Sequence, residues 1–233
     1  MPSREEIVER ALGYPFPRPD RCVLIANGRV EDLTRLDARG RTPVLAYGSN
    51  ASPESLGWKF PEERDAVVPL VRGTIHDLDV VYSSHIAVYG SVPATLQGSP
   101  GTAAETFVAY LTDDQLALVE GWEINATYET LQVDLDLELG EPPAAVGAFV
   151  SRHGALAIDG GPVAVAEVPA RGRRFPALRQ PEVLEHVRAA VAPDLGIHEF
   201  VTGNVEDYER ARAHTARLPA IEFDPSRRGD SNP

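Results

Sequence analysis

A short apolar run that ends in Tyr47-Gly48-Ser49-Asn50 is the segment of the chain best suited to bind a ligand. Gly48 would let the backbone turn sharply and approach a ligand closely. Successive backbone N–H groups after such a glycine can bind an anion, either a carboxylate or the oxyanion of an acyl transfer. Gly-Ser-Asn is also ordinary turn chemistry, so a strand-ending turn without a function is the alternative interpretation.

Two carboxylates, Glu120 and Glu123, lie near the end of a predicted helix further along the chain. A carboxylate beside the apolar stripe of a helix is suited to general acid–base work. With about 100° per residue, both glutamates lie close to Leu116 around the helix, so the helical angle does not separate them. The alternative is that both are solvated surface residues.

Other catalytic patterns are missing from the sequence. It contains no G-x-S-x-G, no G-x-x-x-x-G-K-[ST] and no G-x-G-x-x-G,. The six histidines are scattered and form no H-E-x-x-H, so we expect neither a metal nor an organic cofactor,. The single cysteine, Cys22, excludes a disulfide framework and fits a reducing compartment,.

Composition narrows the class of protein further. The 233 residues are 43% hydrophobic and 24% charged, which is ordinary for a soluble globular protein,. The formal net charge of −13 repels phosphate backbones, so we expect no nucleic-acid partner,. No apolar stretch is long enough to span a bilayer and we expect no signal peptide, so the predicted location is cytoplasmic, without a membrane partner.

The elements expected to position the candidate residues form an α+β pattern. Capping boxes predict helices that start at Ser3 and Thr112, and two more helices are predicted from Pro181 and from Asn204,. Alternating or apolar runs predict strands at residues 44–47, 77–82, 106–111, 130–137 and 145–150,. Residues 30–36 are predicted to form a short amphipathic piece and residues 98–101 a loop,. The predicted organisation is an N-terminal helical extension (1–40), a core (41–151), a C-terminal helical extension (152–222) and a disordered tail (223–233).

The Y-G-S-N segment resembles the strand-loop of the γ-glutamylcyclotransferase-like superfamily. The segments DLDVVYSS, YGSVPATL, SPGTAAETFVAYL and LTDDQLALVEGWEINATY follow it in that family's order, so the resemblance covers residues 44–137. It implies a mixed, mostly antiparallel β-barrel with flanking helices.

The resemblance also distinguishes the two glutamates. The family helix has the pattern L-x-x-L-D-x-x-E, onto which Leu116, Val119, Glu120 and Glu123 align. Glu123 then takes the catalytic position, and Glu120 is the second choice. Ile124 replaces the family's glycine, which puts the identity of the substrate in doubt more than the fold.

The activity implied by the resemblance is cyclisation of a small γ-glutamyl amine, amino acid or peptide to 5-oxoproline, with Glu123 moving the proton and no metal or cofactor. Two alternatives remain open: a non-catalytic module that binds a small metabolite or a protein, and a related amide hydrolase. Residues 83–85 are expected near the pocket, and the oligomeric state does not follow from the sequence. The implied substrate-binding residues are Tyr47, Gly48, Ser49, Asn50, Ala51 (where the family usually has leucine) and Tyr128.

Overall fold

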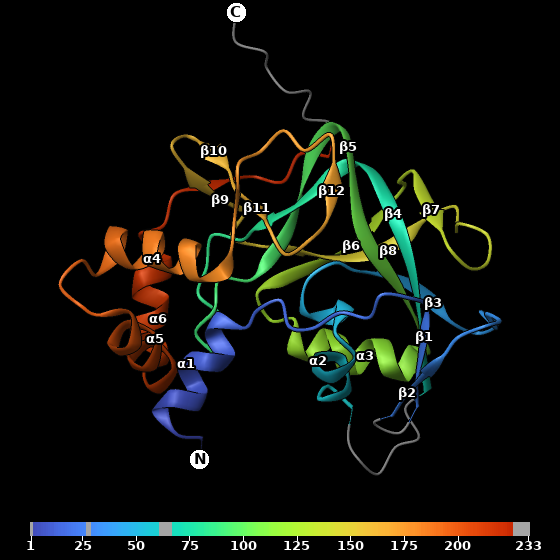
Figure 1. The fold of residues 1–233 in the computed structure, drawn as a ribbon, viewed down its shortest axis with the longest axis horizontal. Helices are drawn as coiled ribbons and strands as arrows, with labels where there is room; N and C mark the ends of the chain where they lie inside the picture. The colour runs from blue at the N-terminus through green and yellow to red at the C-terminus, as the bar shows by residue number, and fades with distance from the viewer. Residues whose placement is uncertain (1, 27–28, 61–66, 226–233) are drawn as a thin grey trace, which may run out of the picture.

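The computed structural model describes residues 2–26, 29–60 and 67–225. Within these ranges eleven strands form one sheet, in which most neighbouring strands are antiparallel, and six α-helices flank it (Figure 1). The predicted α+β class and the mostly antiparallel sheet are therefore confirmed.

Two long strands, β4 (Val67–Tyr82) and β5 (Ala94–Leu111), form the central antiparallel pair of the sheet. Next to β5 lies β3 (Thr42–Ala46), which is antiparallel to β5 and pairs in parallel with β8 (Val146–Ser151) through Val44 and Gly147. Because β3 has a neighbour on each side, the segment that follows it starts from the middle of the sheet. The remaining strands of this sheet are β1 (Val23–Ala26), β2 (Arg29–Asp32), β6 (Ala126–Leu131), β7 (Leu135–Leu137), β11 (Ala164–Val165), β12 (Ala170–Arg171) and β13 (Ala177–Leu178).

The helix that carries the candidate glutamates, α3 (Asp113–Trp122), begins where the sequence predicts. The Thr112 side chain accepts from the N–H of Gln115, and the Gln115 side chain accepts from the N–H of Thr112, which completes the capping box,. Val119 is buried in an apolar cluster that includes Val44 and Phe107 of the sheet. This packing holds the C-terminal end of α3 near the end of β3.

Residues 98–101 do not form the predicted loop. They lie within β5, which continues through them opposite a bulge in β4 between His76 and Leu78. Asp77 in this bulge has φ 59°, and its carboxylate accepts a hydrogen bond of 2.7 Å from the N–H of Gly101, which has φ 82°. Glycine and proline predict a turn locally, but here a bulge accommodates them and the ladder resumes beyond it.

The predicted extensions are corrected in part. Residues 30–36 include β2, an exposed strand paired with β1, and β1 in turn pairs with β4 of the central sheet. Residues 152–222 are helical only from Gln180 onward, because β11 and β12 lie before that point and pair with β4 and β5. Both extensions therefore contribute strands to the sheet. Phe223 packs against the core, and residues 226–233 of the predicted tail lie outside the described residues.

The helices at the two ends of the chain gather on one side of the sheet (Figure 1). The capping box at Ser3 predicts α1 correctly, whereas α5 begins before the predicted start at Asn204. No helix in the described part of the chain has the length and apolar character that a bilayer crossing needs. Two small strands, β9 (Ala155–Ile158) and β10 (Gly161–Pro162), form a further sheet with β14 (Ala220–Ile221). The α-helices besides α3 are α1 (Arg4–Leu12), α2 (Pro53–Gly57), α4 (Gln180–Val191), α5 (Ile197–Glu206) and α6 (Tyr208–Thr215).

Candidate active site

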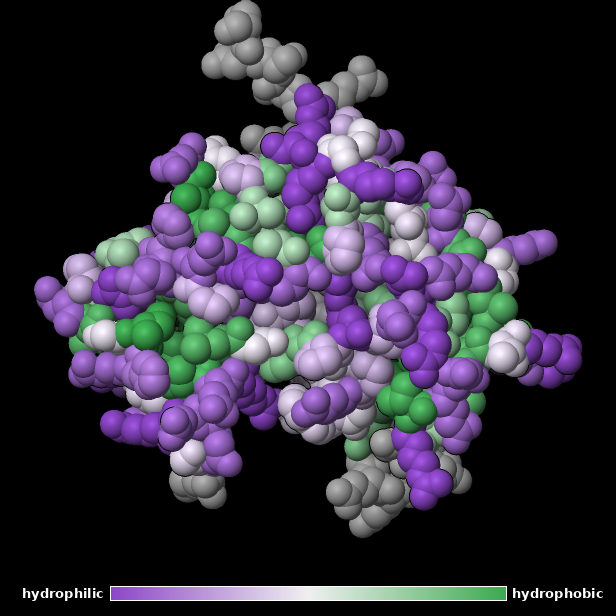
Figure 2. Space-filling model, viewed as in Figure 1, coloured by the Kyte–Doolittle hydropathy of each residue, from purple (hydrophilic) through white to green (hydrophobic). Residues whose placement is uncertain are grey.

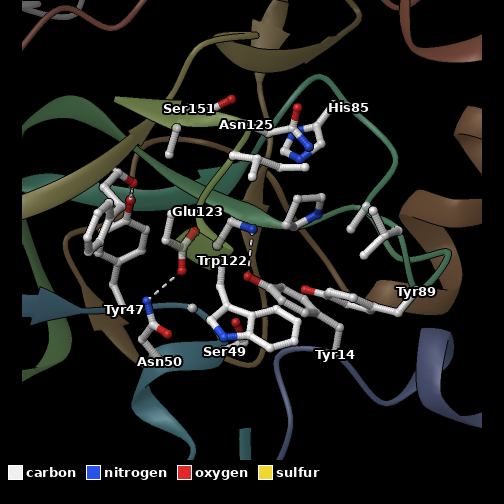
Figure 3. Close-up of a pocket in the computed structure, with 18 of the residues that line it drawn as sticks. Tyr14, Tyr47, Ser49, Asn50, His85, Tyr89, Trp122, Glu123, Asn125 and Ser151 are labelled. Carbon is white, nitrogen blue, oxygen red and sulfur yellow. Dashed lines mark hydrogen bonds between the residues drawn. The ribbon is translucent and has the colours of Figure 1, made fainter. Parts of the chain in front are cut away.

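A cavity of about 300 Å³ lies between the segment after β3 and the end of α3 (Figure 3). Its volume is at the lower end of the range of small-molecule pockets, roughly 300–1,000 Å³. Four residues of the Y-G-S-N segment and Glu123 line it, although 73 residues separate Asn50 from Glu123 in the chain. The residues that line the cavity include Tyr14, Tyr47, Gly48, Ser49, Asn50, His85, Tyr89, Trp122, Glu123, Asn125 and Ser151.

The Glu123 carboxylate is held by the segment after β3. It is the first residue beyond α3, and its N–H still donates to the carbonyl oxygens of Val119 and Glu120. The Asn50 side-chain amide donates a hydrogen bond of 2.9 Å to Oε1 of Glu123, and the two side chains point toward one another in Figure 3. The expectation that Glu123 lies within the helix is thus corrected, because α3 ends at Trp122 and Glu123 occupies the turn that leads into β6.

Lys59 completes this arrangement. Its ammonium group donates to Oε1 of Glu123 at 2.5 Å and to Oδ1 of Asn50 at 2.6 Å, and its side chain is only 11% exposed. The short helix α2, which Ser52 caps, returns the chain so that Lys59 reaches Asn50. Glu123, Asn50 and Lys59 therefore form one hydrogen-bonded triad at the cavity wall.

The start of the segment after Gly48 leaves backbone donors for a ligand. Residues Ser49–Ala51 form one turn of 3₁₀-helix, in which the N–H of Ala51 donates to the carbonyl of Gly48 at 3.0 Å. The N–H groups at the start of such a turn have no partner within it. Ser49 and Asn50 can thus offer backbone donors, whereas the N–H of Ala51 is already used, and its side chain is buried away from the cavity in the apolar cluster with Val119.

Gly48 is required for space and not for an unusual φ. Its φ is −105°, which lies outside the left-handed region that favours glycine,. A Cβ at this position would lie 2.5 Å from the hydroxyl oxygen of Tyr14 and 3.3 Å from the Cβ of Ala94. The Tyr14 hydroxyl accepts a hydrogen bond of 2.6 Å from the N–H of Ala94 (Figure 3). Close approach of two chain segments therefore excludes any side chain here.

Three tyrosines around the cavity stay protonated. Burial raises the pKa of Tyr14 and of Tyr47 above the ordinary value, and it raises the pKa of Tyr89 to about 12. The negative charge of Glu123 adds to each of these shifts as a smaller cause. The Tyr47 hydroxyl donates to the backbone carbonyl of Phe149, which fixes its ring at the cavity wall. These hydroxyls are hydrogen-bonding groups at neutral pH and cannot act as bases.

The opposite wall of the cavity carries a second polar network. The Ser83 hydroxyl is 2.6 Å from the hydroxyl of Ser151 and 2.6 Å from Nδ1 of His85. His85 stacks on His153 with ring centroids 4.8 Å apart, and burial lowers the pKa of His85 to about 3, with the neighbouring His153 a smaller cause. Of residues 83–85, which were expected near the pocket, only His85 lines the cavity, and Ser151 lines it as well. His85 is neutral near pH 7.

Two predicted site residues lie elsewhere. Glu120 is exposed on α3 and Tyr128 lies on β6, and neither lines the cavity. The Tyr128 ring packs edge-on against Phe149, and burial raises the pKa of its hydroxyl, with the charge of Glu120 a smaller cause. Tyr128 is a packing residue at this position, so its expected contact with substrate is not supported. Of the two glutamates, Glu123 is the one in the cavity.

Lys59 is one of the site residues that the sequence reasoning missed, although a signal for it existed. The chain has 22 lysine and arginine residues together, and Lys59 is the only lysine among them. Arginine cannot replace a compact, three-donor ammonium group in a tight triad. Tyr14 and Ser151 gave no comparable signal, because only long-range pairing brings them to the cavity. Within the described residues, no group of three or more His, Cys, Asp or Glu side chains converges as a metal site would require.

The comparisons with known proteins give a structural similarity but no sequence match. No protein-family model matches the sequence, and no curated protein has a significant sequence match. The chain is similar in structure to a γ-glutamyl cyclotransferase, with a TM-score of 0.39 and 12% sequence identity. The alignment covers 78% of this chain and 90% of that chain.

Proposed function

We propose that the protein is a γ-glutamylcyclotransferase-like enzyme that converts γ-glutamyl amines to 5-oxoproline and releases the amine. The observation that carries this proposal is the 2.9 Å hydrogen bond between Asn50 and Glu123 in one cavity. It joins the Y-G-S-N segment to Glu123, the glutamate that aligns with the catalytic position of the γ-glutamylcyclotransferase-like helix pattern. The proposed substrate is a small molecule, and the proposed location is the cytoplasm.

Substrate binding follows from the charges at the cavity wall. The α-ammonium group of the γ-glutamyl moiety lies against the Glu123 carboxylate, which is 24% exposed and reachable from the cavity. The N–H groups of Ser49 and Asn50 bind either the α-carboxylate or the oxyanion that forms during the reaction. Lys59 and Asn50 hold the Glu123 carboxylate in one orientation through their shared hydrogen bonds.

Glu123 moves one proton through the reaction. It accepts a proton from the α-ammonium group, and the free amine attacks its own γ-carbonyl carbon to form the new C–N bond of a five-membered ring. The tetrahedral intermediate collapses, the bond to the leaving nitrogen breaks, and Glu123 returns its proton to that nitrogen. The attacking nitrogen loses its second proton as the ring amide forms, and the released amine takes up this proton and departs as an ammonium ion. The substrate supplies its own nucleophile, and the folded γ-glutamyl chain supplies the proximity.

Amide hydrolysis is the second candidate, and one observation favours it. Ser151 lines the cavity and is connected through Ser83 to His85, which resembles a nucleophile linked to a base,. The pKa of His85 is lowered to about 3, however, so this imidazole is a weak base at neutral pH. A base that weak gives little activation of a serine hydroxyl, so cyclisation is the better-supported reaction.

The test is the product formed from a panel of γ-glutamyl compounds. We expect 5-oxoproline from the wild-type protein and a loss of about 10²–10⁴-fold in rate for Glu123→Gln, which keeps the shape and removes the base. Glu120→Gln is the matched control, because it makes the same change at an exposed site on α3. Free glutamate, together with a γ-glutamyl ester on Ser151, would establish hydrolysis instead. Binding of γ-glutamyl compounds without any product would show that the protein is a non-catalytic binding module.

A further inference from the structure

A second hollow of about 910 Å³ adjoins the Glu123 cavity. It lies between α1 with the segment that follows it, on one side, and α2 with the end of α3 on the other. Figure 2 shows the surface hollowed between the lobe that contains α1 and the lobe that contains α2 and α3. Ser49, Tyr89, Trp122 and Glu123 line both spaces, so the two adjoin. We call this second space the outer groove.

Exposed apolar side chains concentrate at the outer groove. Trp58 is 46% exposed, Val88 53% and Trp122 61%, and all three line it. Ile124, also exposed, lines the adjoining cavity. Large apolar side chains gathered on one surface mark a place where a partner or ligand covers them.

One wall of the outer groove is held rigidly by contacts within the chain. Phe16 has φ 70°, an unusual conformation for a bulky residue, and its ring lies 6.0 Å from the rings of both Trp58 and Tyr89,. The Arg10 guanidinium lies 4.2 Å above the ring of Trp58,. In the described part of the chain Trp122 has no such ring or cation partner, so its faces remain for a ligand.

The charges of the outer groove disfavour an anionic ligand. Four of its lining residues are acidic: Glu123 and, further out, Glu6, Glu9 and Glu54. Of the two basic residues that line it, Lys59 is paired with Glu123, and Arg10 lies over Trp58. A second carboxylate on the ligand would meet this acidic excess within a chain of net charge −13,.

We propose that the outer groove receives the leaving amine. The preferred substrates are γ-glutamyl conjugates of amines that carry an aromatic ring and no further charged group, and this ring lies against Trp122. This inference rests on the proposed function, because the γ-glutamyl half occupies the Glu123 cavity while the amine extends past Glu123 and Trp122 into the adjoining groove. Stacking on an aromatic ring contributes about 0.5–1.5 kcal/mol beyond area burial, which corresponds to roughly tenfold in affinity at the upper end.

Intrinsic fluorescence provides a direct binding assay, since the chain has two tryptophans and both line the outer groove. The probe is N-acetyl-2-phenylethylamine, an uncharged mimic of the leaving half that cannot cyclise, and N-acetylbutylamine is the aliphatic control. We expect the aromatic probe to bind about tenfold more tightly, and this difference to vanish in Trp122→Leu, where Trp58 still reports. Tyr208→Leu is the matched control, because Tyr208 is a comparably exposed aromatic on α6 outside the groove. It should keep the difference.

Turnover of three substrates then tests the chemical class. We expect kcat/KM for γ-glutamyl-2-phenylethylamine to exceed that for γ-glutamylbutylamine about tenfold, and to exceed that for γ-glutamylphenylalanine, which adds only a carboxylate. Equal binding of the two probes, a preference unchanged in Trp122→Leu, or faster turnover of γ-glutamylphenylalanine would overturn the inference. Selective probe binding without 5-oxoproline from any compound would refute the cyclisation and leave the aromatic groove established.

Discussion

The contact between Gly48 and Tyr14 predicts a strong coupling between two substitutions. In Gly48→Ala the new Cβ would lie 2.5 Å from the Tyr14 hydroxyl oxygen. Tyr14 is only 3% exposed, so its ring cannot swing into solvent. The hydroxyl must move, and the hydrogen bond from the N–H of Ala94 breaks. An unsatisfied buried donor costs about 1–3 kcal/mol and overpacking costs a similar amount, so we expect Gly48→Ala to lower the free energy of unfolding by about 2–6 kcal/mol.

Tyr14→Phe isolates the hydrogen-bond part of this cost. It leaves the same N–H without its acceptor and should cost about 1–3 kcal/mol. It also removes the atom that blocks the Cβ at position 48, after which the nearest remaining atoms are the Cβ of Ala94 at 3.3 Å and Cζ of Tyr14 at 3.6 Å. The double variant should therefore be about as stable as Tyr14→Phe alone. The coupling free energy then equals the cost of Gly48→Ala alone, about 2–6 kcal/mol.

Urea unfolding of the four proteins, followed by circular dichroism, measures this coupling. The comparison requires equal m values, which show that the unfolded states are alike. Losses that add within about 0.5 kcal/mol in the double variant would refute the reasoning, since the hydroxyl would then not be what excludes a side chain at position 48.

Four further predictions concern the chemistry of the site. Ser49→Ala should slow 5-oxoproline formation by no more than roughly tenfold, because it removes at most one hydrogen bond. An acyl adduct on Ser49 found by mass spectrometry would instead require a mechanism in which this serine is the nucleophile. Lys59→Met removes the ammonium donor that Asn50 and Glu123 share. We expect kcat to fall by at least about tenfold, with a smaller change in KM. An unchanged kcat in steady-state kinetics would show that Glu123 needs no support from Lys59. The pKa of His85 is lowered to about 3 in the folded protein, so its contribution to stability is complete above pH 6.5 and is lost as the pH falls toward 3,. That loss reaches about 2 kcal/mol at pH 5, and His85→Asn should show a correspondingly smaller fall in stability between pH 7 and 5 in urea titrations. Activity should survive EDTA, and loss of activity that a divalent metal restores would contradict the proposed mechanism.

The sequence by itself determined the elements whose signals are local. The capping boxes at Ser3 and Thr112 predict the starts of α1 and α3 because the reciprocal hydrogen bonds form within one turn,. The apolar run before Tyr47 predicts β3 and the segment that follows it. The preference for Glu123 over Glu120 came from the alignment of this helix with the pattern of the family that it resembles, and Glu123 is the one that lines the cavity.

Local signals misled where long-range pairing competes with them. Residues 98–101 have the composition of a turn, yet they continue β5 because the bulge at Asp77 and the paired strand β4 accommodate them. Residues 130–137 read as one strand, but they divide between β6, which pairs with β8, and β7, which pairs with β4. Ladder hydrogen bonds with a distant partner decide such segments, and that partner leaves no mark in the segment's own residues.

Only the tertiary structure decided which side chains share the cavity. Tyr14 comes from the segment after α1 and Ser151 from the end of β8, and they lie at the cavity because β5 and β8 surround β3. Lys59 reaches Glu123 because α2 turns the chain back, and the exclusion of a side chain at Gly48 depends on a hydroxyl 34 positions earlier in the sequence. The order of strands in a sheet is set by which apolar faces can be buried together across the whole domain. A site built at the meeting point of several strands is therefore not encoded in any one segment.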